Sequence, residues 1–358
     1  MSSPSLQFVV KGDLEQRTGG YIYDAHIIRG LENLGWTISV HSTSPDSANS
    51  KETDAHLGLE DILNSIEDGQ TVILDGLAMG EHPDQLGPHS HRLKLISLMH
   101  HPLFEETGYS ESEKARLLEL EMKALTTCTG VITTSQFTAK QLRGLNVAKK
   151  IVKTVIPGTD QPPSTKGPQH NTPHRLLCVA SIIPRKGLDV LVDALDKIQH
   201  LEWECICAGD LDRSPDYVSK LLNSVAEKHL SNRILFTGEC SNSTIAKLYD
   251  LSTIFVLPSL YEGYGMALTE AAVRGLPVIS TTGGAIPHTL KGTPAFLVPP
   301  GNSTCLADAI ETALNNRPDS DLRLIKSQEA QSRFPTWKQT ARHFEDAVTA
   351  LVPDIRKQ

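Results

Sequence analysis

The sequence predicts an α/β protein of two doubly wound parallel-sheet domains with a cleft between them. Three observations predict this fold. Short apolar runs alternate with helical patterns along the chain, as in consecutive β/α units. The alternation is interrupted once, by a stretch rich in Pro, Ser, Thr and Asn. The chain of 358 residues is also longer than one hydrophobic core usually supports.

The first domain is expected over residues 1–160, followed by a linker at 161–174 that has no apolar periodicity. Helical patterns such as YIYDAHIIRGLENLG and SEKARLLELEMKAL separate its strand-like runs. The runs are LQFVV (6–10), TISVH (37–41), TVILDG (71–76), LKLISLMHH (93–101), GVITTS (130–135) and KTVIPG (153–158).

The second domain is expected over residues 175–335, where the same alternation starts again. Its strand-like runs are RLLCVAS (175–181), WECICAG (203–209), RILFTG (233–238), TIFVLPS (253–259), PVIST (277–281) and AFLVPP (295–300). The last helical segment, within 336–358, can pack back on the first domain or on the second.

Composition narrows the classes of function. The hydrophobic fraction of 39% and charged fraction of 21% are those of a soluble globular protein. No apolar run reaches bilayer length and no export signal begins the chain, so we expect a cytoplasmic protein without integral membrane association. The net charge of −8 argues against nucleic acid as a partner. Oligomeric state stays open.

The six cysteines are scattered, and Cys205 and Cys207 fall on one face of a predicted strand. No second pair follows at zinc-ligand spacing, so buried thiols in a reducing compartment are favoured over a zinc site. DLD (210–212) and DSD (319–321) have the Asp-x-Asp form of a metal motif, but such tripeptides arise by chance. We expect no metal and no other cofactor.

A phosphate site is predicted in SIIPRKGLDVLVDAL, where Arg185 and Lys186 open an amphipathic helix. Cations at a helix N-terminus oppose the helix dipole. A bound anion would remove the conflict, since the free N–H groups there also attract phosphate. The alternative is a solvated pair of basic side chains. We expect Lys186 to be exposed.

A second candidate segment is LYEGYGMALTEAAVRGLPVIST, which reads as turn, helix and strand after a buried strand. Gly263 and Gly265 allow backbone amides to approach a ligand closely. From the helix, Glu270 can reach a ribose hydroxyl pair while the turn holds a diphosphate, with Glu262 just before those amides. A sugar nucleotide has this layout. The alternative is that both glutamates are ordinary turn and helix-surface residues.

Together with RKG, this segment resembles the retaining family 4 glycosyltransferases. TGGYIYDAHIIRGLENLGW resembles the glycine loop of that family's first domain, and LMHHP, VITTSQFTAKQL and VIPGTD resemble later segments, so the resemblance covers nearly the whole chain. It implies the GT-B architecture, in which two Rossmann-like domains face each other across a cleft. In two places the sequence departs from the family: Ala180-Ser181 stands where Gly-Arg is common, and Gly158-Thr159 where Asn-Gly is common.

The resemblance also implies roles for individual residues. Catalytic roles fall to His100 near the transferred sugar, to Glu262 on the sugar hydroxyls, and to Arg185 and Lys186 on the leaving diphosphate. Donor binding is expected from Gly19, Gly20, Arg185, Lys186, Gly263, Tyr264, Gly265 and Glu270. Acceptor binding is expected from Asp13, Thr18 and Tyr21.

The expected function is therefore transfer of a hexose, with retention of configuration, from a nucleotide diphosphate sugar to a hydroxyl. Glucose from UDP-glucose is the expected donor. The acidic residues in SESEKARLLELEMKAL remove the polybasic face of a lipid-binding helix, which favours a small soluble acceptor, for example a pteridine such as tetrahydrobiopterin. The alternatives are a lipid or polysaccharide acceptor, a sugar-nucleotide epimerase or hydrolase, and a non-catalytic sensor.

Overall fold

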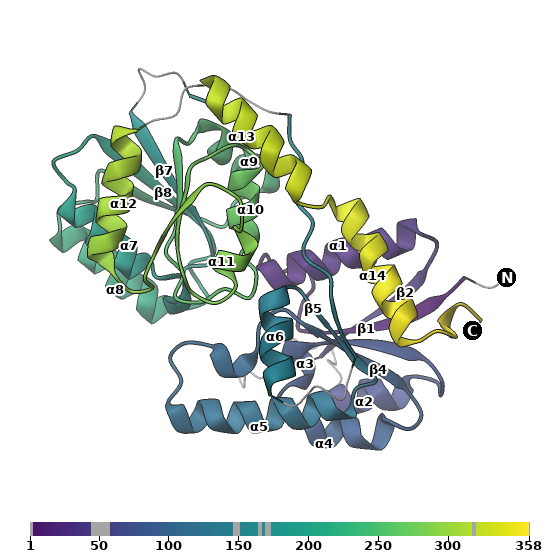
Figure 1. The fold of residues 1–358 in the computed structure, drawn as a ribbon. Coiled ribbons are helices and arrows are strands. Elements are labelled where there is room, and N and C mark those ends of the chain that lie inside the picture. The colour runs from purple at the N-terminus through teal and green to yellow at the C-terminus, as the bar shows by residue number, and fades with distance from the viewer. Residues whose placement is uncertain are drawn as a thin grey trace. The chain divides into compact units, whose positions relative to one another are not determined.

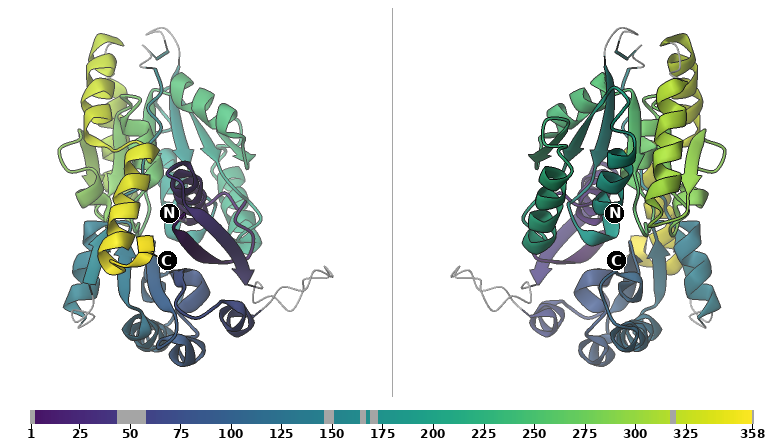
Figure 2. Two further views of the ribbon diagram at one scale, coloured as in Figure 1. Left: turned by 90° about the vertical axis from the view of Figure 1, so that its right-hand side faces the viewer. Right: turned by 90° about the vertical axis from the view of Figure 1, so that its left-hand side faces the viewer.

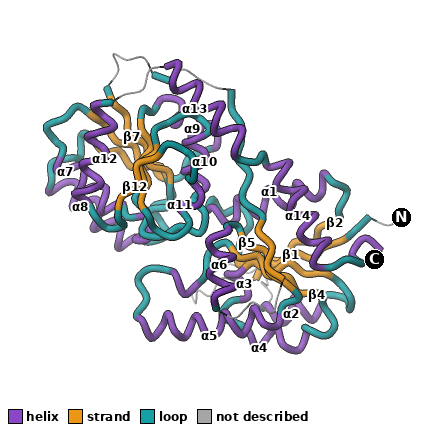
Figure 3. The backbone as a smooth tube through the Cα atoms, viewed as in Figure 1, coloured by secondary structure: helices purple, strands orange, loops and turns teal. Residues whose placement is uncertain are grey.

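The computed structural model describes residues 3–43, 58–145, 151–163, 167–168, 173–316 and 320–357. The chain forms two compact units (Figure 1). The first consists of Met1–Gly158 and Trp337–Gln358, and the second of Thr159–Thr336. Each has a six-stranded parallel sheet with helices around it, the strands being orange and the helices purple in Figure 3.

The sheet of the first unit has the strand order β2-β1-β3-β4-β5-β6. Its strands are β1 (Ser5–Lys11), β2 (Thr37–Thr43), β3 (Thr71–Asp75), β4 (Lys94–Met99), β5 (Gly130–Thr133) and β6 (Ile151–Thr154). Its α-helices are α1 (Gly19–Asn33), α2 (Leu59–Ser65), α3 (Gly76–Met79), α4 (Pro83–Leu86), α5 (Glu111–Thr127), α6 (Gln136–Gly144) and α14 (Trp337–Leu351). Its 3₁₀ helices are η1 (Gly87–His89), η2 (Leu103–Glu105) and η5 (Ile355–Lys357).

The sheet of the second unit has the strand order β12-β11-β10-β7-β8-β9. Its strands are β7 (His174–Val179), β8 (Trp203–Ala208), β9 (Ile234–Gly238), β10 (Ile254–Leu257), β11 (Val278–Thr281) and β12 (Ala295–Val298). Its helices are η4 (Pro184–Lys186), α7 (Leu188–Lys197), α8 (Pro215–Glu227), α9 (Asn242–Leu251), α10 (Met266–Ala272), α11 (Ile286–Thr289), α12 (Ser303–Asn315) and α13 (Ser320–Arg333).

Every predicted strand-like run overlaps a strand, and the predicted class of two Rossmann-like parallel-sheet units is confirmed. The alternation of side chains explains why. Val72 and Leu74 of β3 belong to one apolar cluster, whereas Ile73 between them belongs to another on the opposite face of the sheet. A strand buried on both faces reads as a continuous apolar run, which is the pattern found in the sequence.

Two boundaries differ from the sequence-based expectation. β6 covers Ile151–Thr154 instead of 153–158, because Pro157 has no N–H to donate to a sheet ladder. The expected linker at 161–174 is grouped with the second unit, β7 begins at its last residue, and part of it lies outside the described residues.

The C-terminal helix α14 packs in the first unit, beside α1 (Figures 1 and 2). Its Phe344 and Val348 are fully buried in the apolar cluster on that face. The two helices approach closely where α1 carries Gly30, since a Cβ there would overlap the side chain of Ala341. Among the described residues, no helix is long and apolar enough to cross a membrane.

Candidate functional site

In the second unit, Arg185, Lys186 and Glu262 lie in the segments that follow the carboxyl ends of the parallel strands. Arg185 and Lys186 follow β7 in η4, and Glu262 follows β10 in the loop before α10. Open α/β sheets bind their ligands at this edge. The loop after β11, with Gly283 and Gly284, lies at the same edge.

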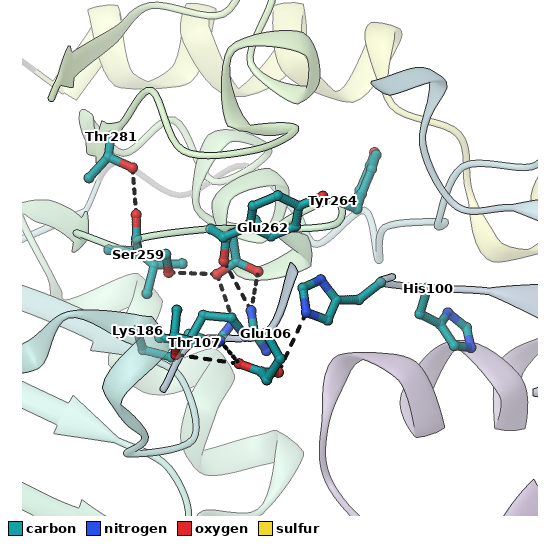
Figure 4. A network of polar contacts seen from close by, with 12 residues as sticks. His100, Glu106, Thr107, Lys186, Ser259, Glu262, Tyr264 and Thr281 are labelled. Atoms are coloured by element: carbon teal, nitrogen blue, oxygen red, sulfur yellow. Dashed lines mark hydrogen bonds and ion pairs between the residues drawn. The ribbon is translucent and has the colours of Figure 1, made fainter. Parts of the chain in front are cut away.

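Glu262 is the centre of a buried polar cluster (Figure 4). Only 5% of the residue is exposed. Its Oε1 accepts hydrogen bonds from Lys186 Nζ at 2.6 Å and from Ser259 Oγ at 2.6 Å. Arg185 Nη1 lies 3.7 Å from its Oε2 and donates to the Tyr261 carbonyl at 3.0 Å. The structure therefore brings Arg185, Lys186 and Glu262 together, although the sequence separates them.

The charges in this cluster are mutually stabilising. Burial alone would raise the pKa of Glu262, but the charges of Lys186 and Arg185 and the hydrogen bonds from Lys186 and Ser259 lower it below its ordinary value. Glu262 is thus an anion between two cations at neutral pH. The expectation that Lys186 is exposed was wrong, because its side chain is turned onto Glu262 and is only 15% exposed.

Gly187 explains how η4 comes so close to the loop after β10. Its φ of +67° lies in the left-handed region, and a Cβ there would overlap the carbonyl oxygen of Pro258. The N–H of Leu260 also donates to the Arg185 carbonyl at 2.8 Å. The glycine of the RKG motif therefore allows η4 to lie close enough to this loop for Lys186 to contact Glu262.

The loop after β11 supports the Glu262 loop. Thr281 Oγ1 donates to the Ser259 carbonyl at 2.6 Å (Figure 4), and the N–H of Ala285 donates to the Glu262 carbonyl at 2.8 Å. A Cβ on Gly284 would overlap that same Glu262 carbonyl. This support depends on contacts between two separate loops, which the sequence does not reveal.

Glu270 lies on α10 and is half-buried. Its Oε2 accepts a hydrogen bond of 2.9 Å from the hydroxyl of Tyr249 on α9. Burial raises the pKa of Glu270, although the bond from Tyr249 and the charge of Arg274 act in the opposite direction. Tyr249 was not predicted, because nothing in the spacing relates a residue of α9 to a carboxylate 21 positions later.

The predicted donor residues Gly263, Tyr264 and Gly265 form the turn into α10. Gly265 has a φ of +92°, which accounts for glycine at this position. Tyr264 is 7% exposed, and its hydroxyl is buried without a hydrogen-bond partner among the described residues. Most buried polar atoms in proteins are hydrogen-bonded, so a buried phenol without a partner is uncommon.

In the first unit, Gly19 and Gly20 begin α1, directly after Thr18. A Cβ on Gly20 would lie 3.3 Å from Cδ2 of His100, so the glycine leaves room for this ring. His100 Nε2 is 2.9 Å from Oδ1 of Asp24, and Figure 4 shows the ring turned toward α1. Gly20 and His100 therefore lie side by side in the first unit, and their contacts with a donor stay predictions.

His100 belongs to a cluster with Asp24 and Asp75 that the sequence did not indicate. Burial would lower the pKa of His100, but the charge and hydrogen bond of Asp24 and the charge of Asp75 raise it. Burial and the charge of Asp24 raise the pKa of Asp75 to about 7. Among the described residues, these three are the group whose oxygen and nitrogen atoms are placed to hold a metal ion, within 4.8 Å of one another.

The segment after His100 is anchored by a buried carboxylate. Glu121 of α5 is fully buried, and both of its oxygens lie 3.1 Å from the N–H of Leu103 in η2. Burial raises the pKa of Glu121 to about 7, against the lowering effect of the backbone N–H bonds. His101 in this segment lies 3.5 Å from Glu106.

The residues predicted for the acceptor are spread over the segment before and into α1. Asp13 is exposed and accepts a bond of 2.8 Å from the N–H of Glu15. Tyr21 is buried, and its hydroxyl donates to the Lys11 carbonyl. Thr18 is half-buried and makes no side-chain cap bond at the start of α1. Their contacts with an acceptor stay predictions.

Two further sequence features have structural explanations. Gly158 is close-packed, since a Cβ there would meet backbone atoms of Trp337 at 2.6 Å. In DLD (210–212), Asp210 accepts the N–H of Asp212 at 2.8 Å and lies 3.3 Å from Arg213, so it stabilises its own loop. Part of DSD (319–321) lies outside the described residues.

Comparison with known protein families finds a match that covers the second unit. Residues 163–331 match the model of a family described as glycosyl transferases group 1. The second unit is therefore similar to this family over nearly its whole length. Both glutamates, Arg185 and Lys186 lie inside the matched segment.

Curated relatives match part of the chain at moderate identity. The lipopolysaccharide core biosynthesis mannosyltransferase LpsB of Rhizobium meliloti is 30% identical over 148 residues, which is 39% of this chain and 41% of that protein. The alpha-D-kanosaminyltransferase of Streptomyces kanamyceticus is 28% identical over 151 residues, 41% of this chain and 37% of that protein. The matches thus span about two fifths of these relatives.

Solved structures extend the similarity to the whole fold. A sucrose-phosphate synthase from Thermosynechococcus elongatus has a TM-score of 0.80 at 19% identity, covering 98% of this chain and 99% of that one. HepE of Anabaena in complex with UDP-glucose has a TM-score of 0.73 at 17% identity, covering 97% and 100%. The GT-B fold class predicted from the sequence is therefore confirmed.

Proposed function

We propose that the chain is a retaining glycosyltransferase that moves a hexose from a nucleotide diphosphate sugar to an acceptor hydroxyl. The observation that carries the proposal is the cluster of Arg185, Lys186 and Glu262 at the carboxyl edge of the second sheet. The match of the segment that holds this cluster to the group 1 family supports it.

The chemistry of the cluster fits departure of a diphosphate. As the bond between the sugar C1 and the phosphate oxygen breaks, negative charge develops on that oxygen. Lys186 and Arg185 stand within 4 Å of Glu262, so together they supply a net positive charge to stabilise the leaving group. The acceptor oxygen forms the new bond to C1, and its proton passes to the departing phosphate oxygen.

The two glutamates are assigned different partners. Glu262 is proposed to accept hydrogen bonds from sugar hydroxyls, because its carboxylate is kept ionised beside the two cations. Glu270 is proposed to accept from a ribose hydroxyl pair, with Tyr249 holding one of its oxygens. The roles of Gly19, Gly20 and His100 toward the donor stay predictions from the family resemblance.

Glucose from UDP-glucose remains the proposed donor. HepE, which shares the fold, has been solved with UDP-glucose. For the acceptor, a small molecule such as a pteridine stays our prediction from the sequence, and the relatives bring no support for the pteridine in particular. Their names include lipopolysaccharide core enzymes, a phosphatidylinositol N-acetylglucosaminyltransferase and a 2-deoxystreptamine N-acetyl-D-glucosaminyltransferase.

The proposal is tested by offering the chain UDP-, GDP- and ADP-sugars, each with a panel of soluble and lipid acceptors, and analysing the products by mass spectrometry. A glycosylated acceptor with the anomeric configuration of the donor is expected. Donor alone serves as the matched control. If the donor sugar is epimerised without any acceptor, the transferase proposal is wrong and the epimerase alternative is right.

A further inference from the structure

The second unit contains a cavity at the amino edge of its sheet, the edge opposite to the Glu262 cluster. It has a volume of about 380 Å³ and is lined by the residues that lead into β11 and β12, the end of α12 and one face of α13 (Figure 1). Mostly apolar cavities of about 300–1,000 Å³ are typical small-molecule sites. Since the proposed donor residues follow the carboxyl ends of the strands, this cavity is a separate site.

The walls of the cavity are mainly aliphatic. Leu276 before β11 and Ala330 on α13 are buried, whereas Phe296 and Leu322, which also line the cavity, are 41% and 42% exposed. An aliphatic ligand in the cavity would remove this apolar surface from water, and that removal favours binding.

Four charged side chains line the cavity, and three of them have their partners within the protein. Lys326 Nζ lies 2.9 Å from Glu329 Oε2, so these two charges balance each other. Arg323 is 5% exposed, and its guanidinium donates to three backbone carbonyl groups. Arg333 forms no ion pair among the described residues and donates only to the Lys291 carbonyl, at 3.1 Å. One unbalanced positive charge therefore borders the cavity.

The loop before β12 places a hydroxyl group next to this charge. A Cβ on Gly292 would overlap the guanidinium of Arg333, so the glycine allows that group to lie against the loop. The next residue, Thr293, lines the cavity, and its Oγ1 is buried without a hydrogen-bond partner in the described part of the chain. Most buried polar atoms are hydrogen-bonded, and a ligand oxygen would supply the missing partner.

We propose that the cavity binds one small carboxylate with an aliphatic body, of the class of a medium-chain fatty acid. Arg333 donates to the carboxylate with its planar guanidinium, which matches the two carboxylate oxygens. The Thr293 hydroxyl donates to the same group, and the aliphatic body contacts the walls formed by residues such as Leu276 and Ala330.

The charge of the site favours a carboxylate over a phosphate monoester. A phosphate monoester carries a charge of about −1.5 to −2 at neutral pH, which exceeds the single positive charge of Arg333. A carboxylate carries one negative charge and balances it. The proposal goes beyond the glycosyl transfer proposed above, because the cavity lies at the other edge of the sheet and its walls suit an aliphatic chain.

The test is a calorimetric titration of the full chain with sodium octanoate at neutral pH. The titration contains no nucleotide, so its outcome does not depend on the proposed transfer reaction. Saturation at one octanoate per chain is expected. Two comparison ligands separate the parts of the site: 1-octanol lacks the charge and acetate lacks the aliphatic body, and each should bind about tenfold more weakly or less.

Two variants locate the bound octanoate. Arg333→Met keeps an unbranched apolar side chain and removes the charge, so octanoate affinity should fall about tenfold while 1-octanol affinity stays unchanged. Ala330→Leu fills part of the cavity and should weaken the binding of both ligands. Lys220→Met, on the exposed side of α8 in the same unit, is the matched control and should bind octanoate like the wild type.

Melting temperatures of the ligand-free proteins show whether each variant is folded. Arg333 is exposed, so Arg333→Met provides the test even if Ala330→Leu does not fold. Three outcomes overturn the proposal: no saturable octanoate binding, equal affinity for octanoate and 1-octanol, or equal octanoate affinity in the wild type and Arg333→Met.

Discussion

Lys186 and Glu262 are 76 positions apart in the sequence, yet Lys186 Nζ lies 2.6 Å from Glu262 Oε1. Ser259 donates to the same oxygen at 2.6 Å, and both ends of the ion pair are largely buried. In the proposed reaction, Lys186 contacts the diphosphate of the donor as well as Glu262. Lys186 therefore contributes both to the stability of the folded protein and to turnover.

Replacing Lys186 by Ala is expected to impair both properties. Loss of a positioned cation at the leaving phosphate should lower the turnover rate by about a hundredfold or more. Because the buried Glu262 then keeps only Arg185 and Ser259 as partners, the variant should also lose about 1–3 kcal/mol of unfolding free energy. Initial rates and urea unfolding measure the two effects.

Lys220→Ala, an exposed lysine on α8 in the same unit, is the control and should change neither quantity. Near-normal turnover in Lys186→Ala would remove this residue from the site.

Gly187→Ala is expected to destabilise the second unit and to reduce donor binding. The new Cβ would overlap the Pro258 carbonyl and push η4 away from the loop that carries Glu262. Gly301→Ala is a matched control, since Gly301 has a similar φ of +74° but no described atom lies within 4 Å of the place its Cβ would take. Each substitution should lower the unfolding free energy by about 1 kcal/mol or more, because alanine is strained in the left-handed region. Any further destabilisation in Gly187→Ala is then caused by the overlap with the Pro258 carbonyl. Equal melting temperatures would contradict this account.

Tyr249→Phe is expected to weaken UDP binding about tenfold. The variant keeps the buried ring and loses only the hydroxyl that orients Glu270, and a hydrogen bond to a charged group contributes about 1.5–3 kcal/mol. Calorimetry with UDP measures the change. Tyr217→Phe, which removes a comparable bond to Asp189, is the control and should leave UDP affinity unchanged. Unaltered affinity in Tyr249→Phe would mean that Glu270 needs no such support.

Glu121 predicts a pH dependence of stability. Its pKa is raised to about 7 in the folded protein from an ordinary value of 4.5, so the folded state binds more protons than the unfolded state between these values. Stability from this group is therefore fully present at low pH and is lost as the pH rises toward and past 7. Relative to Glu121→Gln, the wild type should lose a few kcal/mol of unfolding free energy between about pH 5 and about pH 8.

Parallel urea titrations of the two proteins at several pH values give this difference directly. A difference that stays constant with pH would show that the carboxylate of Glu121 is ionised throughout.

The sequence predicts the fold better than the contacts of the site. Strands such as β3 are buried on both faces, and continuous apolar runs reveal them without tertiary information. The RKG motif and the turn around Glu262 were recognised because their residue types are unusual at a helix start and in a strand-to-helix turn. Their mutual ion pair depends on β7 and β10 being neighbours in the sheet, which local sequence does not encode.

The same limit explains what was missed. Tyr249 reaches Glu270 from another helix, and Asp24, Asp75 and His100 come from three separate β/α units. Spacing reveals which residues share one helix face or one strand, but not which carboxylate a distant hydroxyl or imidazole will contact.

The most direct test of a donor site in the second unit separates its two glutamates by calorimetry with UDP. Glu270→Gln should weaken UDP binding, since an amide holds two ribose hydroxyls less well than a carboxylate. Glu262→Gln should leave UDP affinity nearly unchanged and should reduce transfer from the complete donor, because its partner is the sugar. If Glu262→Gln loses UDP affinity while Glu270→Gln keeps it, the two roles are reversed, and if both variants bind UDP and react like the wild type, the donor site lies elsewhere.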